Sequence, residues 1–290
     1  MDETALENIP RFSWGEIKKR ISERSPFEAI SPMGTVLFRV KTYEPWLGLA
    51  AHAGHRVREE LIPKMGIDEN ERLYEEDAYV DYFISSAPIQ IVGLDSRFEY
   101  DVNRARDHAV YLKPFESWGK KVWKTPPTKD ELELSYQKYD EFHELLDYFV
   151  EQMTGMFEKI LVMDMHSYNY KRQTYAGRAN ALPLFNLGTT AIDRTKHKPV
   201  IEKVLKHLGE ISLPGIPASV AENDVFKGNG AIASAVASKY SDSLLLNIEV
   251  KKVYMNETTG ELHPSHVKAL SESFAKLGRS VMQGLSGGKK

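Results

Sequence analysis

The chain has 290 residues, of which 42% are hydrophobic and 27% charged, a composition typical of a folded globular protein with a substantial core. Its net charge of -3 does not favour nucleic acid as a partner, because proteins that bind nucleic acid usually carry a basic surplus. The absence of cysteine excludes disulfides and thiolate metal ligands. With no secretion signal at the start and no apolar run near the roughly 20 residues that span a bilayer, we expect a cytoplasmic protein without membrane partners.

The first part of the chain predicts a peripheral segment followed by the start of a sheet. Residues 1–34 are charged and contain one amphipathic stretch, so we expect a helical extension and a linker ahead of a single domain over residues 35–290. Within that domain, strands are expected at 35–40, 46–51, 88–93 and 97–104, and helical segments at 56–65 and 69–85. The strand at 46–51 ends in a histidine, and the strand at 97–104 ends in Asn-Arg.

The second part of the chain alternates helices with strands. Residues 107–127 are aromatic and interrupted by proline, which predicts an irregular surface segment. Helices are then expected at 128–156, 199–208, 229–240 and 265–285, and strands at 160–166, 182–187, 218–222 and 243–250. This alternation is typical of βαβ units, so we predict an α/β fold with a mixed, largely parallel central sheet flanked by helices.

A continuous apolar run over residues 160–163 leads directly to His166. The run indicates a strand buried on both faces, whose carboxyl end lies where α/β proteins bind their ligands. Alone, such a histidine is more often a hydrogen-bonded structural residue, but His52 follows another buried strand and Glu249 lies inside a third. Two imidazoles and a carboxylate around an open position suit catalytic zinc. A further carboxylate can act as a base, and an arginine such as Arg104 can bind a substrate carboxylate.

Three segments resemble those of zinc carboxypeptidases. Residues 164–168 resemble the strand end that presents the last zinc histidine of these enzymes, and Asn103 with Arg104 resembles their pair for the substrate carboxylate. Glu249 resembles their general-base glutamate. The order of further motifs is more similar to the N-formylglutamate amidohydrolase family, a relative with a phosphorylase/hydrolase-like α/β fold.

The resemblance to this family extends from about residue 36 to residue 274. A strand ending in His-Ala-Gly occurs at residues 52–54, and two aspartates four residues apart occur at Asp77 and Asp81. The most specific motif is the Ser-Arg-Phe-x-x-Asp-x-Asn-Arg run at residues 96–104.

The resemblance implies one zinc ion held by His52 and His166. The third ligand is open among Asp77, favoured by the recurring aspartate of the family, His55, favoured by its spacing from His52, and Glu60.

The resemblance also implies roles for residues around the metal. Glu249 would be the general base, and Arg97 a partner for the developing oxyanion. Asp164 would orient a metal-bound histidine. Four residues are expected to bind the substrate's carboxylates: Asn103 and Arg104 one of them, and Arg178 and Arg194 a second. Tyr254 is expected to close over the substrate.

The expected function is therefore a zinc-dependent amidohydrolase that cleaves the N-acyl amide, typically N-formyl, of a carboxylate-bearing amino acid such as N-formylglutamate. Its partner would be this small molecule, and the sequence makes no prediction of the oligomeric state. Two alternatives stay open because a fold does not determine a function. The first is a carboxypeptidase or a deacylase of N-acetyl amino acids. The second is a metal-free protein that binds carboxylates through Arg97, Arg104 and Arg194.

Overall fold

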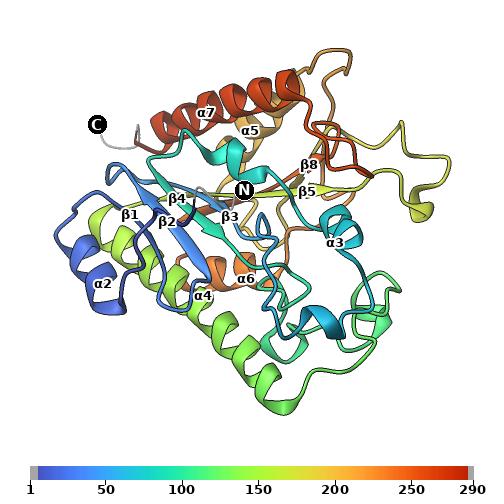
Figure 1. Ribbon diagram of the computed structural model, residues 1–290. Coiled ribbons are helices and arrows are strands. Elements are labelled where there is room, and N and C mark those ends of the chain that lie inside the picture. The colour runs from blue at the N-terminus through green and yellow to red at the C-terminus, as the bar shows by residue number, and fades with distance from the viewer. Residues whose placement is uncertain (1–5, 287–290) are drawn as a thin grey trace.

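Eight strands form one sheet between two layers of helices in the computed structural model, which describes residues 6–286 (Figure 1). In order across the sheet, the strands are β1 (Phe27–Ile30), β2 (Val36–Val40), β4 (Ile89–Gly93), β3 (Trp46–Ala50), β5 (Leu161–Tyr168), β8 (Leu244–Lys251), β6 (Phe185–Gly188) and β7 (Val220–Glu222). The central neighbours β4, β3, β5 and β8 are parallel, whereas β2 and β6 pair antiparallel to β4 and β8. The predicted α/β fold with a mixed, largely parallel sheet is confirmed.

Helices cover both faces of this sheet (Figure 1). One face carries α2 (Trp14–Ser22), α4 (Lys129–Met156) and α6 (Ala231–Lys239), and the other carries α5 (Lys198–Glu210) and α7 (Pro264–Ser286). The connections contain α3 (Glu69–Glu75) and the short 3-10 helices η1 (Ile62–Lys64), η2 (Val80–Ile84), η3 (Arg106–His108), η4 (Pro114–Glu116) and η5 (Gln173–Tyr175). Within residues 6–286, the structure contains no helix with the length and apolar character needed to cross a bilayer.

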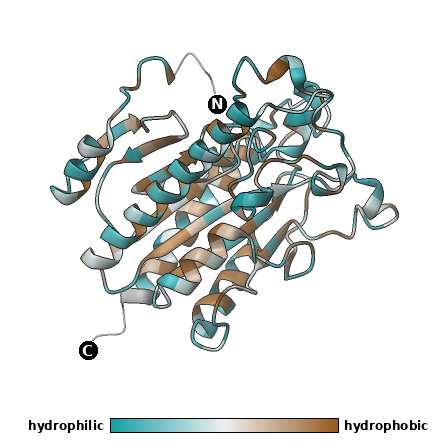
Figure 2. Cartoon of the chain, turned by 90° about the horizontal axis from the view of Figure 1, so that it is seen from below, coloured by the Kyte–Doolittle hydropathy of each residue, from teal (hydrophilic) through white to brown (hydrophobic). Residues whose placement is uncertain are grey.

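The central strands are buried on both faces, which explains their continuous apolar runs. In β3, Leu49 packs into the core beneath α4, while its neighbour Ala50 packs into the core beneath α7. Ile91 and Val92 divide in the same way on β4. Figure 2 shows hydrophobic residues along the sheet and hydrophilic residues on the outer surfaces of the helices. Burial of each large apolar side chain contributes roughly 1.5–3 kcal/mol, so both faces stabilise the sheet.

The segment expected as a linker contains a strand. Residues 27–30 form β1 at the edge of the sheet, paired antiparallel with β2, and Ile17 and Ile21 of α2 are buried in the core beside it. The strand was not predicted because it is short and the residues around it are charged, as in a linker. The first part of the chain therefore adds an edge to the sheet as well as the predicted helix.

Residues 97–104 were expected to form a strand, and this prediction is wrong. They form consecutive turns, in which the amide of Glu99 donates to the carbonyl of Ser96 and the amide of Arg104 donates to the carbonyl of Asp101. Apolar and polar residues alternate in the sequence, but all five residues from 98 to 102 are buried. The turns enclose the polar side chains of Glu99 and Asp101 as fully as the apolar ones, which the pleat of a half-buried strand would not do.

The two helical segments expected between β3 and β4 are also different from the prediction. Residues 56–65 are irregular apart from η1, because their backbone bonds to the segment after β4, including Ser96 N to Arg56 O at 2.7 Å. Residues 69–85 are divided into α3 and η2. The break occurs where the amide of Asp77 donates to the carbonyl of His52 at 3.1 Å, which takes residue 77 out of the helix.

The carboxyl ends of β3, β4, β5 and β8 meet at one edge of the sheet. His52 follows β3 directly, and His166 on β5 lies opposite Glu249 on β8 in the strand register. The loops after β3 and β4 touch at Gly54, where an added Cβ would lie 2.2 Å from the carbonyl carbon of Leu94. Glycine is required at this position because no side chain fits between the two backbones.

Candidate metal centre and active site

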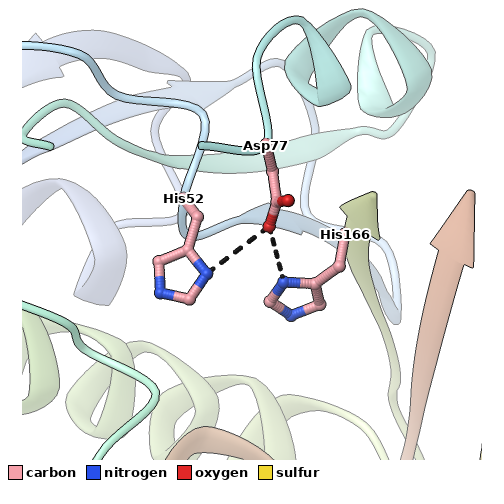
Figure 3. Close-up of side chains that lie close together, drawn as sticks. All are labelled: His52, Asp77 and His166. Carbon is pink, nitrogen blue, oxygen red and sulfur yellow. Dashed lines mark hydrogen bonds and ion pairs between the residues drawn. The ribbon is translucent and has the colours of Figure 1, made fainter. Parts of the chain in front are cut away.

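His52, Asp77 and His166 come together at this edge of the sheet (Figure 3). Each offers one ligand atom, and these atoms lie within 4.8 Å of one another. The Asp77 Oδ2 atom lies 3.1 Å from His166 Nδ1 and 3.5 Å from His52 Nδ1. All three residues are at least 97% buried. Two imidazole nitrogens and one carboxylate oxygen directed at one point are a ligand set typical of catalytic metal sites.

Carboxylates behind the two histidines fix the orientation of their rings. Asp101 Oδ1 lies 2.8 Å from His52 Nε2, and Asp164 Oδ2 lies 3.0 Å from His166 Nε2. Each ring therefore presents its Nδ1 atom toward Asp77. A carboxylate on the far nitrogen of an imidazole is the usual support of a metal-bound histidine. The position of Asp164 thus agrees with its predicted orienting role.

Asp77 reaches the two histidines because the backbone around it is held in place. The buried ammonium of Lys252 donates to the carbonyl oxygens of Tyr74 and Glu76, both at 2.6 Å. The hydroxyl of Ser167 donates to Asp77 Oδ1 at 3.0 Å. These contacts fix both the segment and the carboxylate that it carries.

The electrostatics of the centre favour a cation. Asp77, Asp101, Asp164 and Glu249 are all buried. Burial raises the pKa of Glu249 above its ordinary value, and the neighbouring carboxylates add to this effect. Although burial opposes the protonation of His166, Asp164 and Asp77 hold its pKa well above the ordinary value. Burying several carboxylates together is unfavourable unless positive charge neutralises them.

The residues present fit a divalent metal ion. The His52 Nδ1 atom is buried and makes no hydrogen bond to the described residues, although it faces the Asp77 carboxylate. A buried imidazole nitrogen without a hydrogen-bond partner can be a metal ligand, and a bound cation would neutralise the buried carboxylates around it.

A cavity of about 650 Å³ opens beside these ligands. Its wall includes Glu249, which is buried and lies next to His166 across the β5–β8 pair. The predicted residues Arg97, Asn103 and Arg104 also line it. The structure therefore brings seven of the predicted residues around one cavity: His52, Asp77, His166, Glu249, Arg97, Asn103 and Arg104.

The two arginines of the motif at residues 96–104 share one carboxylate. Arg97 Nη2 lies 2.7 Å from Asp101 Oδ2, and Arg104 Nε lies 3.9 Å from the same atom. Arg97 is mostly buried, whereas about half of the Arg104 side chain is exposed. Asn103 contacts the start of α6, where an added Cβ on Gly230 would lie 2.0 Å from Asn103 Oδ1. Arg104 is thus the more accessible cation on this side of the cavity.

Two predicted arginines do not contribute to the cavity wall. Arg178 is largely exposed, and its Nη2 atom lies 3.7 Å from Asp224 Oδ2. Arg194 pairs with Glu222, with Nε 2.8 Å from Oε1. Both lie in the predicted loops, but the loops direct them to carboxylates elsewhere.

Tyr254 is also placed differently from the prediction. Its side chain is fully buried, and its hydroxyl donates to the carbonyl of Ala78 at 2.8 Å. Its ring packs edge-on against Phe83, with the ring centroids 5.0 Å apart. Tyr254 therefore supports the segment after Asp77 and does not close over the cavity.

His55 and Glu60, the other candidates for the third ligand, lie apart from the two histidines. His55 bonds through Nδ1 to Glu76 and lies 3.3 Å from Glu69 through Nε2. Glu60 pairs with Arg58 at 2.8 Å. Of the three candidates for the third ligand, Asp77 is the one that lies next to His52 and His166.

The sequence reasoning missed several residues of the cavity wall, among them Glu75, Trp118 and Arg172. Arg172 follows His166 by six residues and lies in the same loop as Arg178. Its position close to a predicted metal ligand could therefore have identified it from the sequence. Trp118 lies in the segment expected to be an irregular covering, where nothing in the sequence indicates which aromatic side chain faces the cavity.

The mixed sheet, with a cavity and a possible metal site at the carboxyl ends of its parallel strands, defines an α/β protein with a candidate active site. The sequence model of the N-formylglutamate amidohydrolase family matches residues 44–255. The chain belongs to this family, and the predicted family resemblance is confirmed. The family identifies it as an amidohydrolase.

The solved structures similar to this fold include the following two. N-formylglutamate amidohydrolase from Ralstonia eutropha JMP134 has a TM-score of 0.71 at 18% identity, covering 88% of this chain and 99% of the other. A gene product of Agrobacterium tumefaciens has a TM-score of 0.63 at 13% identity, covering 87% of this chain and 96% of the other. A search of curated proteins found no match. At these identities the likeness concerns the fold alone.

Proposed function

We propose that the protein is a zinc-dependent amidohydrolase that removes the N-formyl group from a carboxylate-bearing amino acid such as N-formylglutamate. The observation that carries this proposal is the convergence of His52, Asp77 and His166 in the same cavity as Glu249 and Arg104. Family membership supports the amide bond as the target, and the site supports the metal.

His52 Nδ1, His166 Nδ1 and Asp77 Oδ2 would hold the zinc ion. When bound, zinc supplies a Lewis acid that lowers the pKa of a water molecule and polarises a carbonyl group. Asp101 and Asp164 would keep both rings in the orientation that metal binding requires. A carboxylate and two neutral imidazoles leave a further position open for water or substrate.

Glu249 would move the proton during hydrolysis. Its carboxylate would take a proton from the attacking water, whose oxygen bonds to the amide carbon. The C–N bond then breaks, and Glu249 gives the proton to the leaving nitrogen, so that formate and the free amino acid are the products. Burial raises the pKa of this carboxyl group, which makes it a stronger base for this transfer. Arg97, buried in the cavity wall, would stabilise the negative charge on the amide oxygen.

The charge of the cavity supports an anionic substrate. Four cationic and four carboxylate side chains line it: Arg97, Arg104, Arg172, Lys227, Glu75, Asp77, Asp101 and Glu249. With Asp164 behind His166 as a fifth carboxylate, the formal charge is -1, so a divalent metal ion would leave one positive charge in excess. A positive excess attracts an anionic substrate. The volume of about 650 Å³ is in the range of small-molecule sites and accommodates an acylated amino acid.

The test is to measure the metal content of the purified protein and its hydrolysis of N-formylglutamate, N-acetylglutamate and a peptide ending in glutamate. We expect about one zinc ion per chain, removal of activity by a chelator, and the fastest release from the N-formyl substrate. His166→Ala should lose the metal as well as the activity. Undiminished hydrolysis by metal-free protein would contradict the proposed zinc dependence. Preference for the acetyl or peptide substrate would instead favour a deacylase or a carboxypeptidase.

A further inference from the structure

Two groups of cations lie near the metal ligands. In the first group, Arg97 and Arg104 share Asp101, which contacts His52. In the second, Arg172 pairs with Glu75, two residues before Asp77 in the sequence. Two residues of extended chain span at most about 7 Å, so the backbone of Glu75 lies close to that of Asp77.

Arg172 is held by its partners in a definite position. Two of its nitrogens bond to the two oxygens of Glu75, which is buried. Its guanidinium carbon lies 4.8 Å from the ring centroid of Trp118 and 5.9 Å from that of Tyr74. A guanidinium has five N–H donors, so after the pairing with Glu75 some remain for a ligand in the cavity. About one fifth of the Arg172 side chain is exposed, which leaves it accessible.

Trp118 connects the two groups of cations. The guanidinium carbon of Arg97 lies 4.9 Å from its ring centroid, so the ring contacts Arg97 as well as Arg172. These two contacts place the guanidinium carbons of the two arginines at most about 10 Å apart. The backbone of Trp118 has a φ of 53°, a left-handed conformation that side-chain-bearing residues rarely adopt. Such a conformation persists only where the surroundings impose it, so the backbone at Trp118 is fixed by its surroundings.

Arg104 and Arg172 line the same cavity and pair with different carboxylates, Asp101 and Glu75. The cavity of about 650 Å³ accommodates an acylated amino acid. An elongated substrate with two carboxylates can present one of them to each of these arginines, since a guanidinium binds a carboxylate through charge-assisted hydrogen bonds.

We propose that Arg172, oriented by Glu75 and Trp118, binds the second carboxylate of an N-acyl dicarboxylic amino acid and makes the enzyme selective for it. This proposal rests on the proposed function. It assigns the role expected of Arg178 and Arg194 to a residue in the cavity wall. Arg104 binds the α-carboxylate, and Arg172 distinguishes a glutamyl side chain from its uncharged amide.

The test compares kcat/KM for N-formylglutamate with that for N-formylglutamine, which has the same shape without the second charge. The double variant Glu75→Gln with Arg172→Gln is used so that no unpaired buried carboxylate remains. We expect the ratio of the two kcat/KM values to fall by about 30-fold or more, mainly through KM for N-formylglutamate. Arg178→Gln, in the same loop but outside the cavity, should change the ratio by less than about twofold. Metal content is measured for every protein.

Two results overturn the inference while leaving the proposed function intact. One is an unchanged ratio in the double variant, and the other is an equal fall in the Arg178→Gln control. If the zinc-loaded wild-type protein hydrolyses neither N-formyl substrate, the proposed function itself fails. The wild-type measurement therefore separates the two failures.

Discussion

Lys252 offers a way to disturb the metal centre without touching a ligand. Its ammonium donates to the carbonyls of Tyr74 and Glu76, in the segment that leads directly to Asp77. Replacement by methionine keeps the length of the side chain and removes both donors. Asn169 Nδ2 also donates to the Tyr74 carbonyl at 2.7 Å, so the carbonyl of Glu76 is the group that loses its donor.

Two opposing effects should make the change in the free energy of unfolding of Lys252→Met small. Burial lowers the pKa of Lys252 from 10.5 to about 8, which corresponds to about 3 kcal/mol of unfavourable free energy for the ammonium at neutral pH. Methionine removes this penalty, but hydrogen bonds from a charged donor, worth about 1.5–3 kcal/mol each, are lost. We expect the two to cancel within about 2 kcal/mol. The metal affinity has no such compensation and should fall by about 10–100-fold, as is typical when support of a metal ligand is removed.

The pKa of Lys252 also predicts how stability depends on pH. Because the pKa is lower in the folded protein, the unfolded chain binds more protons between pH 8 and pH 10.5. The ammonium's unfavourable contribution is therefore complete below pH 8 and disappears as the pH rises toward 10.5. Over that range, wild-type stability should increase relative to that of Lys252→Met by up to about 3 kcal/mol.

The assay is competition for zinc against a chelating indicator, with thermal or urea unfolding of the metal-free protein as the measure of stability. Lys251→Met is the matched control, because Lys251 donates to the carbonyls of Ala179 and Leu182 rather than to the Asp77 segment. The reasoning is refuted if Lys252→Met binds zinc as tightly as the wild type. It is also refuted if Lys251→Met loses as much affinity.

Three further substitutions test other parts of the site. Glu249→Gln should retain zinc and reduce kcat by about 10²–10⁴-fold, measured by metal analysis and formate release; loss of zinc would show that Glu249 is a ligand. Arg104→Gln should raise KM for substrates with a free α-carboxylate, and an equal loss on an uncharged N-formyl amide would argue against this role. Gly54→Ala should destabilise the protein by about 3 kcal/mol in urea unfolding, since its Cβ would lie 2.2 Å from the Leu94 carbonyl carbon; wild-type stability would contradict the close contact.

The central sheet could be predicted because its strands are buried on both faces. Continuous apolar runs such as residues 46–51 are typical of strands covered on both sides, and they located β3, β5 and β8 together with the histidines at the ends of β3 and β5. Residues 97–104 gave the wrong element because their sequence alternates like a strand, whereas turns bury the apolar and the polar positions alike. Residues 69–85 were expected to be continuous because a hydrogen bond from Asp77 to His52 cannot be read from local sequence.

The candidate site was predictable where side chains are fixed by strands and less so where they depend on loops. His166 and Glu249 lie on paired strands, so the buried pattern of each strand placed them at the same edge. Arg178 and Arg194 were misplaced because partners far away in sequence, Asp224 and Glu222, determine where loop side chains point. Arg172 was missed for the same reason, since its pairing with Glu75 spans 97 residues of sequence.

The strand register between His166 and Glu249 has a consequence for how the protein could diversify. Neighbouring strands lie about 4.8 Å apart, so backbone hydrogen bonds of the central sheet set the spacing between these two groups. Arg104 and Arg172, in contrast, are carried by segments outside the strands. Insertions or exchanges in those segments can alter the recognised side chain while the hydrolytic groups keep their spacing. New substrate ranges are therefore accessible to this architecture through its loops, without rebuilding the sheet.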